Sequence, residues 1–156
     1  HTAIRLARDA GARLVIAGPV FEPDRPYFDA RIRDQIDGRQ IVYLGPADHA
    51  LKVGLMQRAQ ALVLPLEVDE TFGLAMIEAM ACGTPVLAYD RGAVPEVVAH
   101  GETGFAVHTY EELRESLPRL AGLQPQRCRD HVAQNFSRDT MVAAYVKLYE
   151  EMGRGA

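Results

Sequence analysis

Short, wholly apolar runs recur along this chain, separated by longer stretches in which apolar and polar residues mix. The runs occupy residues 14–17, 41–44, 61–64, 85–88 and 105–107, and Gly-Pro or Pro follows the first three of them. A run of three or four apolar residues without polar alternation is typical of a strand buried on both faces of a parallel sheet. The pattern therefore predicts five parallel strands.

The stretches between these runs have the pattern of helices. We expect helices over residues 4–10, 27–36, 49–58, 96–99, 111–120, 126–135 and 139–152, with Asp48 and Ser137 as N-caps. A further helix begins near residues 72–74 and stops at residues 82–85. Strands that alternate with helices predict an α/β fold with a Rossmann-like, doubly wound parallel sheet. Ligands bind such sheets at the carboxyl ends of the strands, beside helix N-termini.

One predicted helix carries an unusual charge. The stretch from Asp69 to Pro85 reads DETFGLAMIEAMACGTP, and Glu78 is the only charge within its apolar part. A helix that is apolar on nearly every side is expected to be buried. A carboxylate on such a helix needs a partner. Either the hydroxyls of a ligand or an ion pair with a Lys or Arg would provide one.

The start of the same helix has the features of a ligand site. The first N–H groups of a helix have no internal partner and favour anions, and Gly73 lets a ligand approach the backbone. The alternative is that Gly73 serves only close packing. Glu70 precedes the helix by a few residues, so Glu70 and Glu78 would contact different parts of one extended ligand. For Glu70 the alternative is a capping carboxylate on its own helix.

Composition narrows the class of protein. The chain has 156 residues, 48% of them hydrophobic, and a formal net charge of -4, which fits one globular domain. It has no basic block, so we expect neither a nucleic-acid partner nor binding to an anionic membrane. The two cysteines and the absence of a long apolar run favour a cytoplasmic location without a membrane span. The histidines lack metal-ligand spacing, so no metal is expected.

The stretch ETFGLAMIE, followed by AMACGTPV, resembles the E-x7-E motif of retaining GT-B glycosyltransferases of family 4 (glycosyl transferases group 1). Further similarity lies at residues 14–18, 42–45, 95–98, 101–105 and 145–149, so the resemblance covers nearly the whole chain. It implies the C-terminal, donor-binding half of a GT-B fold. The full enzyme would move a hexosyl unit from a nucleotide diphosphate sugar to an acceptor hydroxyl with retention of configuration.

The resemblance also implies roles for residues. Glu70 would be the catalytic residue that contacts the transferred sugar, and Glu78 would bind the nucleotide ribose. The backbone N–H groups of Phe72, Gly73 and Leu74 would face the sugar hydroxyls and the diphosphate. The other donor-binding positions are Gly18, Gly45, Ala47 and Lys52, with the loop at Gly45 and Ala47 touching the base. For Lys52 the alternative is an ordinary solvated side chain. No cofactor and no metal is implied.

The same resemblance predicts the domain organisation. Residues 1–137 would form an N-terminally truncated donor domain, and the helix in residues 138–156 would cross towards a missing acceptor-binding domain, or support a dimer. The Arg and Lys that neutralise the diphosphate in this family would precede His1, and the missing domain would provide any peripheral membrane attachment. We therefore expect this chain alone to be inactive. The alternatives are a GT-B-like nucleotide-sugar epimerase and a non-catalytic nucleotide-binding module.

Overall fold

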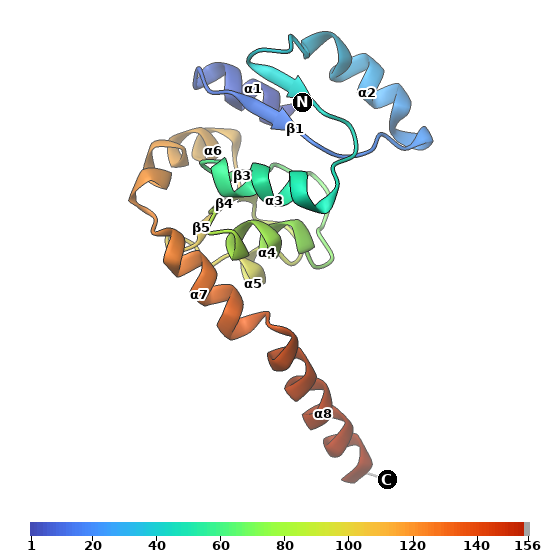
Figure 1. Ribbon diagram of the computed structural model, residues 1–156, viewed down its shortest axis with the longest axis vertical. Coiled ribbons are helices and arrows are strands. Elements are labelled where there is room, and N and C mark those ends of the chain that lie inside the picture. Colours follow the sequence, from blue (N-terminus) through green and yellow to red (C-terminus); the bar gives the residue numbers. More distant parts are fainter. Residues whose placement is uncertain (155–156) are drawn as a thin grey trace.

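The computed structural model describes residues 1–154, as helices arranged around short parallel strands (Figure 1). The strands are β1 (Leu14–Ile16), β2 (Ile41–Tyr43), β3 (Leu62–Leu64), β4 (Val86–Tyr89) and β5 (Gly104–Val107). Each lies within a predicted apolar run or overlaps most of it, so periodicity located all five strands. Of the predicted C-terminal region 138–156, the last two residues lie outside the described residues.

All strand pairs are parallel, which confirms the predicted α/β class. β1 pairs with β2, with Val15 opposite Val42. β4 lies between β3 and β5, with Leu87 opposite both Val63 and Phe105. The five strands thus form two sheets instead of one. The strands β4 and β5 are almost fully buried, whereas β1 and β3 are only half-buried.

The α-helices are α1 (Thr2–Asp9), α2 (Arg25–Arg31), α3 (His49–Arg58), α4 (Leu74–Ala81), α5 (Val94–Val97), α6 (Tyr110–Ser116), α7 (Pro125–Asn135) and α8 (Arg138–Arg154). Three short 3-10 helices, η1 (Glu22–Asp24), η2 (Arg33–Gln35) and η3 (Pro118–Gly122), accompany them. The predicted N-caps are confirmed, since the Asp48 carboxylate accepts from the Leu51 N–H at 2.8 Å and the Ser137 hydroxyl from the Thr140 N–H at 3.1 Å.

Two predicted helices are too long and a third is displaced. The helix expected over 27–36 ends at Arg31, because the Gln35 side chain donates to the Arg31 carbonyl at 2.6 Å, the acceptor that a continuing α-helix would use. The helix expected over 111–120 ends at Ser116, where Pro118 opens η3 instead. The helix expected over 96–99 lies at Val94–Val97.

Helix α1 connects the two sheets. Leu6 packs in one cluster with Leu87 of β4 and Phe105 of β5, while Ile4 packs in another with Ile41 of β2. Both side chains are almost fully buried. A third cluster joins Met76 and Met80 of α4 to β4 and α7. These contacts hold α4, and with it the predicted ligand site, against the central strand.

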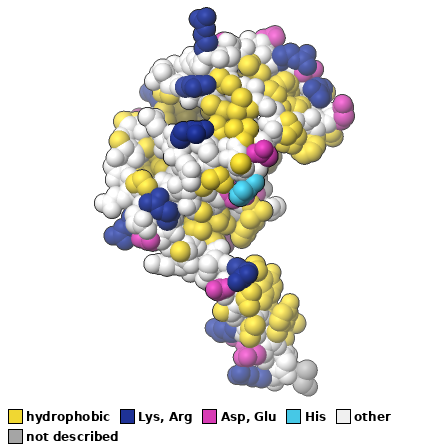
Figure 2. All heavy atoms as spheres, in the orientation of Figure 1, with side chains coloured by type: hydrophobic (Ala, Val, Ile, Leu, Met, Phe, Trp, Pro, Cys, Tyr) yellow, Lys and Arg dark blue, Asp and Glu magenta, His cyan; other side chains and the backbone are white. Residues whose placement is uncertain are grey.

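Helix α8 extends away from the rest of the molecule (Figure 1), and every one of its described residues is exposed. Hydrophobic side chains gather along it in the view of Figure 2. The exposed apolar residues are Met141, Val142, Tyr145, Val146, Leu148, Tyr149 and Met152. Within the part of the chain that the structure describes, no helix has the length and hydrophobicity needed to cross a bilayer.

Candidate functional site

The loop between β3 and α4 contains Glu70, which makes hydrogen bonds through both its side chain and its backbone. Its carboxylate Oε1 accepts from the Thr71 N–H at 2.9 Å and from the Phe72 N–H at 3.3 Å. Its carbonyl accepts from the Ala93 N–H at 2.8 Å, and Glu70 forms an isolated parallel bridge with Gly92. The alternative of a cap on its own helix is therefore wrong for Glu70, because its carboxylate bonds to loop N–H groups that precede α4, which has no side-chain cap.

The beginning of α4 leaves backbone donors available. Gly73 has φ +81°, in the left-handed region, and a Cβ there would lie 2.0 Å from the Met76 Cε and 3.3 Å from the Glu70 Cγ. Its conformation and the crowding both favour glycine. In the described structure, the N–H groups of Gly73 and Leu74 donate to no protein atom. They are free to bind a ligand, whereas the Phe72 N–H is occupied by Glu70.

The expectation that the helix is enclosed on every side is wrong at its first turn. Leu74 is 67% exposed and Phe72, just before the helix, is 50% exposed, although Met76, Ala79 and Met80 are fully buried. The apolar pattern cannot distinguish a surface covered by the domain's own core from one that faces a ligand or another part of a longer protein. The exposed apolar residues lie beside the free N–H groups.

Glu78 lies on α4, about one turn and a half beyond Gly73. It is paired with Lys52 of α3. The Lys52 Nζ lies 2.5 Å from the Glu78 Oε1, and the side chains are 36% and 40% exposed. The ion pair that the sequence left open for Glu78 is therefore present, and the alternative of a simply solvated Lys52 is wrong. A carboxylate has several acceptor positions. Because the pair is partly open to solvent, Glu78 keeps capacity for further hydrogen bonds.

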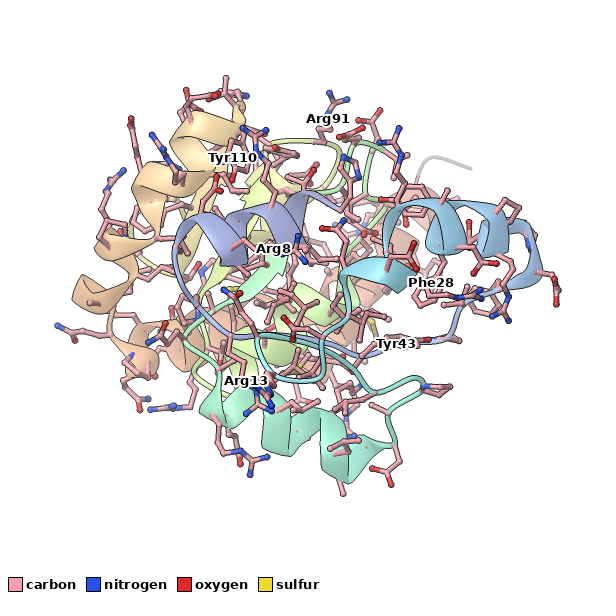
Figure 3. All side chains as sticks on the ribbon, turned by 90° about the horizontal axis from the view of Figure 1, so that it is seen from above. Arg8, Arg13, Phe28, Tyr43, Arg91 and Tyr110 are labelled. Carbon is pink, nitrogen blue, oxygen red and sulfur yellow. The ribbon has the colours of Figure 1, made fainter. Side chains whose placement is uncertain are left out.

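The loops that follow β1 and β2 are joined to each other. The Gly18 N–H donates to the Gly45 carbonyl at 2.8 Å, and the Tyr43 hydroxyl donates to the Gly18 carbonyl at 2.9 Å. The Tyr43 ring packs on Phe28 of α2, with ring centroids 5.1 Å apart (Figure 3). Ala47, half-buried, continues this loop to the N-cap of α3, one turn before Lys52.

The predicted residues are thus brought together in three linked groups. Gly18 is bonded to Gly45, Lys52 is paired with Glu78, and Glu70 packs against the start of α4. Helix α3 carries Lys52 and begins just after Ala47, and α4 carries Glu78 and begins just after Gly73. The two helices therefore connect the loop predicted to touch the base with the loop that contains Glu70.

Sequence reasoning missed the part that Gly92 and Ala93 play. The Gly-Ala-Val-Pro sequence shortly after the fourth apolar run indicates a turn there. What no pattern shows is that this turn lies against Glu70, more than twenty residues earlier in the chain.

Two hollows lie near the ends of β4 and β5. One of about 440 Å³ lies beside the Glu70 loop and is lined by Asp69, Tyr89, Arg91, Gly92 and His108 among others. The other, of about 620 Å³, lies between α5, β5 and α6. Neither is lined by Glu70 or Glu78, which are both half-buried. Across residues 1–154, no cluster of His, Cys, Asp or Glu is placed to hold a metal ion.

The sequence of this chain matches one protein family and is similar to known proteins. The profile of the family described as "Glycosyl transferases group 1" matches residues 2–134. The N-acetyl-alpha-D-glucosaminyl L-malate synthase of Bacillus anthracis is 32% identical over 126 residues, which are 74% of this chain and 32% of that protein. The chain thus spans about a third of the length of this curated relative.

Solved structures share the fold. The crystal structure of AviGT4, a glycosyltransferase involved in Avilamycin A biosynthesis, matches with a TM-score of 0.74 and 27% identity, over 99% of this chain and 48% of that one. Anabaena Alr3699/HepE, solved in complex with UDP and glucose, matches with a TM-score of 0.77 and 21% identity, over 94% of this chain and 44% of that one. The second similarity shows the fold alone. Together with the parallel sheets, these matches show that the fold is that of part of a GT-B glycosyltransferase.

Proposed function

We propose, because this chain belongs to the glycosyl transferases group 1 family, that it is the donor-binding part of a retaining GT-B glycosyltransferase of family 4. The whole protein would move a hexosyl unit from a nucleotide diphosphate sugar to an acceptor hydroxyl. The chain by itself would bind the donor and transfer nothing, since the acceptor site would belong to a domain outside it. Family membership favours this function over an epimerase or a non-catalytic module.

The observation that carries the proposal is the arrangement along α4. At its start, the Gly73 and Leu74 N–H groups are free and Glu70 lies against them; further along the same helix is Glu78. The free N–H groups and the helix dipole favour a diphosphate at the start of α4. Glu70 then lies on the side of the transferred sugar and Glu78 on the side of the ribose. A rigid helix fixes the spacing between these positions.

The pair of Lys52 and Glu78 has a defined part in this proposal. Lys52 contacts Oε1 of the carboxylate, so its charge holds Glu78 in place. The remaining acceptor positions are available to the two hydroxyls of a ribose. Lys52 itself adds positive charge beside the nucleotide. The loop that contains Gly18, Gly45 and Ala47 lies at the base end, next to the start of α3.

The chemistry proposed here is electrostatic. Negative charge develops on the diphosphate as the bond to the sugar breaks, and donors aimed at that charge in advance lower the barrier. The Gly73 and Leu74 N–H groups would supply part of this stabilisation. In the whole protein, we expect an Arg and a Lys ahead of His1 to supply more. The carboxylate of Glu70 would have to turn from the Thr71 and Phe72 N–H groups towards the sugar hydroxyls. No metal or cofactor is part of the proposal.

Nucleotide binding by this chain is the direct test. We expect isothermal titration calorimetry to detect binding of at least one of UDP, GDP and ADP, or of their hexose conjugates, at concentrations up to about millimolar. Circular dichroism of the same sample establishes that the chain is folded. A folded chain that binds none of these ligands would contradict the proposed donor site. Incubation with donor and simple acceptors is expected to give no glycoside.

A further inference from the structure

We propose that Gly92 is a positioning residue for Glu70, and that the turn after β4 holds the catalytic carboxylate in place through the backbone. The inference rests on the proposed function of Glu70. It concerns a contact between two segments that sequence reasoning treated separately. Gly92 touches no reacting atom; its effect is exerted through the Glu70 backbone.

The contact between the two segments is close. A Cβ at position 92 would lie 2.2 Å from the Glu70 carbonyl oxygen and 2.6 Å from the Glu70 nitrogen. Both of these atoms are backbone atoms, so no side-chain rotation relieves the clash. The Ala93 N–H donates to the same carbonyl at 2.8 Å. Only a residue without a side chain at position 92 allows this approach.

The turn after β4 is held more firmly than the loop that contains Glu70. The turn is anchored at both ends: Tyr89 ends the central strand, and Val94 and Val97 of α5 are almost fully buried. The Asp90 N–H also donates to the Val107 carbonyl at 2.7 Å. By contrast, Val68 is 67% exposed. Among the described residues, the backbone hydrogen bonds that join residues 66–72 to another segment run to this turn. The turn therefore restrains the loop that contains Glu70.

Gly92→Ala is the decisive substitution, and Gly101→Ala is its matched control. Both glycines are exposed and have a left-handed φ, +55° and +80°, but a Cβ at position 101 would meet nothing within 4 Å. The intrinsic strain of alanine at a positive φ is thus common to both variants. Only Gly92→Ala also pushes against Glu70, by roughly 1 Å, a displacement that is costly for a catalytic group.

The kinetic test uses the whole enzyme in which this chain occurs. We expect Gly92→Ala to lower kcat by about 10- to 100-fold while the KM for the donor stays within about twofold, and Gly101→Ala to leave both near wild type. In a Glu70→Ala background, Gly92→Ala is expected to cause no further loss, because the two residues act on the same step. Ala93→Pro, which removes the N–H and is compatible with the Ala93 φ of -75°, is expected to reproduce the kcat effect if Gly92→Ala does not fold.

The variants test the role of Glu70 in transfer and the positioning role of Gly92 separately. If Glu70→Ala leaves transfer intact, the proposed role of Glu70 is wrong. If Glu70→Ala abolishes transfer but Gly92→Ala behaves like Gly101→Ala, or multiplies the loss in the double variant, the positioning role is wrong. A readout independent of activity is hydrogen exchange of the Ala93 amide in this chain. It is expected to be at least about tenfold faster in Gly92→Ala than in Gly101→Ala, and equal rates would overturn the inference.

Discussion

Glu70 and Glu78 show how differently two carboxylates are held on one short segment. Glu70 is bonded to uncharged N–H groups of its own loop, so its carboxylate is free to exchange these bonds for bonds to a ligand. Glu78 is bonded to the Lys52 ammonium, a partner on another helix. A partly exposed ion pair contributes little to stability. The pair is better explained by the orientation that it gives to Glu78.

Glu78→Ala is expected to weaken binding of a nucleoside diphosphate to this chain by about 10- to 100-fold, the value of one hydrogen bond to a charged group. The physical reason is the loss of the carboxylate that accepts from the ribose hydroxyls. Calorimetry with the nucleotide that the wild type binds measures the effect.

Glu70→Ala is the matched control for that measurement, because it removes a carboxylate from the same segment without touching the ribose position. Its nucleotide affinity is expected to stay within about twofold of wild type. Equal binding by wild type and Glu78→Ala would show that the ribose assignment is wrong.

Tyr110 joins α6 to α1. These two helices pack on the face of the β3–β5 sheet opposite to the face that α4 covers. Its hydroxyl donates to the Asp9 carboxylate at 2.6 Å, and the Arg5 guanidinium lies 3.8 Å from its ring centroid. Burial, followed by the hydrogen bond to Asp9, raises the pKa of Tyr110 to about 12. The folded protein therefore favours the neutral phenol more strongly than the unfolded chain does.

The sign of the pH effect follows from this pKa. Between pH 10, the ordinary pKa, and about 12, the folded state holds a proton that the unfolded state has lost, so stability falls as pH rises. The contribution is complete below pH 10. We expect the difference in the free energy of unfolding between wild type and Tyr110→Phe to shrink as pH rises from 10 towards 12. Urea titrations at several pH values measure it, and a constant difference would contradict the assignment.

At the scale of elements, the helices α4 and α6 begin in contrasting ways. Helix α6 has a capping box, in which the Thr109 hydroxyl accepts from the Glu112 N–H at 3.2 Å and the Glu112 carboxylate accepts from the Thr109 N–H at 3.4 Å. Helix α4 begins just after Gly73 and has no side-chain cap. The free donors of an uncapped helix are unfavourable unless a ligand or water binds them. The start of α4 therefore leaves donors that the proposed diphosphate would bind, whereas the start of α6 is satisfied by its own side chains.

Thr109→Ala is expected to lower the free energy of unfolding by about 1 kcal/mol, because it removes the acceptor for the Glu112 N–H. Thr109→Ser keeps a hydroxyl at the cap and is expected to remain close to wild type. Urea denaturation of both variants at one pH makes the comparison. Similar losses in the two variants would show that the methyl group, and not the cap, is responsible.

At the scale of the molecule, α8 is separate from the core that α1, α4 and the strands form. None of its described residues is buried, yet it carries a long apolar face. An apolar face of this size marks an interaction surface. We propose that it packs on the acceptor domain of a longer protein, with a second copy of the chain as the alternative.

The double variant Tyr145→Asp and Tyr149→Asp tests this proposal. In the isolated chain we expect the free energy of unfolding to change by less than about 0.5 kcal/mol, since both side chains are exposed. In the longer protein we expect the melting temperature to fall by a few degrees. Replacement of the charged pair Lys147 and Glu151 of the same helix by alanine is the control. Sedimentation of the isolated chain shows whether the wild type self-associates; a dimer that the double variant abolishes would favour the second copy.

The sequence by itself determined the fold class, the five strands and the N-caps, and it predicted the segment that carries the candidate site. These features are local: an apolar run, a Gly-Pro stop or a capping side chain acts within a few residues of its own position. The two helices predicted too long were limited by equally local causes, Gln35 and Pro118, whose effects depend on details of hydrogen bonding that periodicity does not include.

Only the tertiary structure decided which partner each site residue has. The pairing of Lys52 with Glu78 and the approach of Gly92 to Glu70 join residues more than twenty positions apart. The exposure of Leu74 likewise depends on what surrounds it. The physical reason is that these contacts arise when helices pack on strands and loops meet at a sheet edge. Residue type limits what each side chain is able to do, and packing determines which of those interactions it makes.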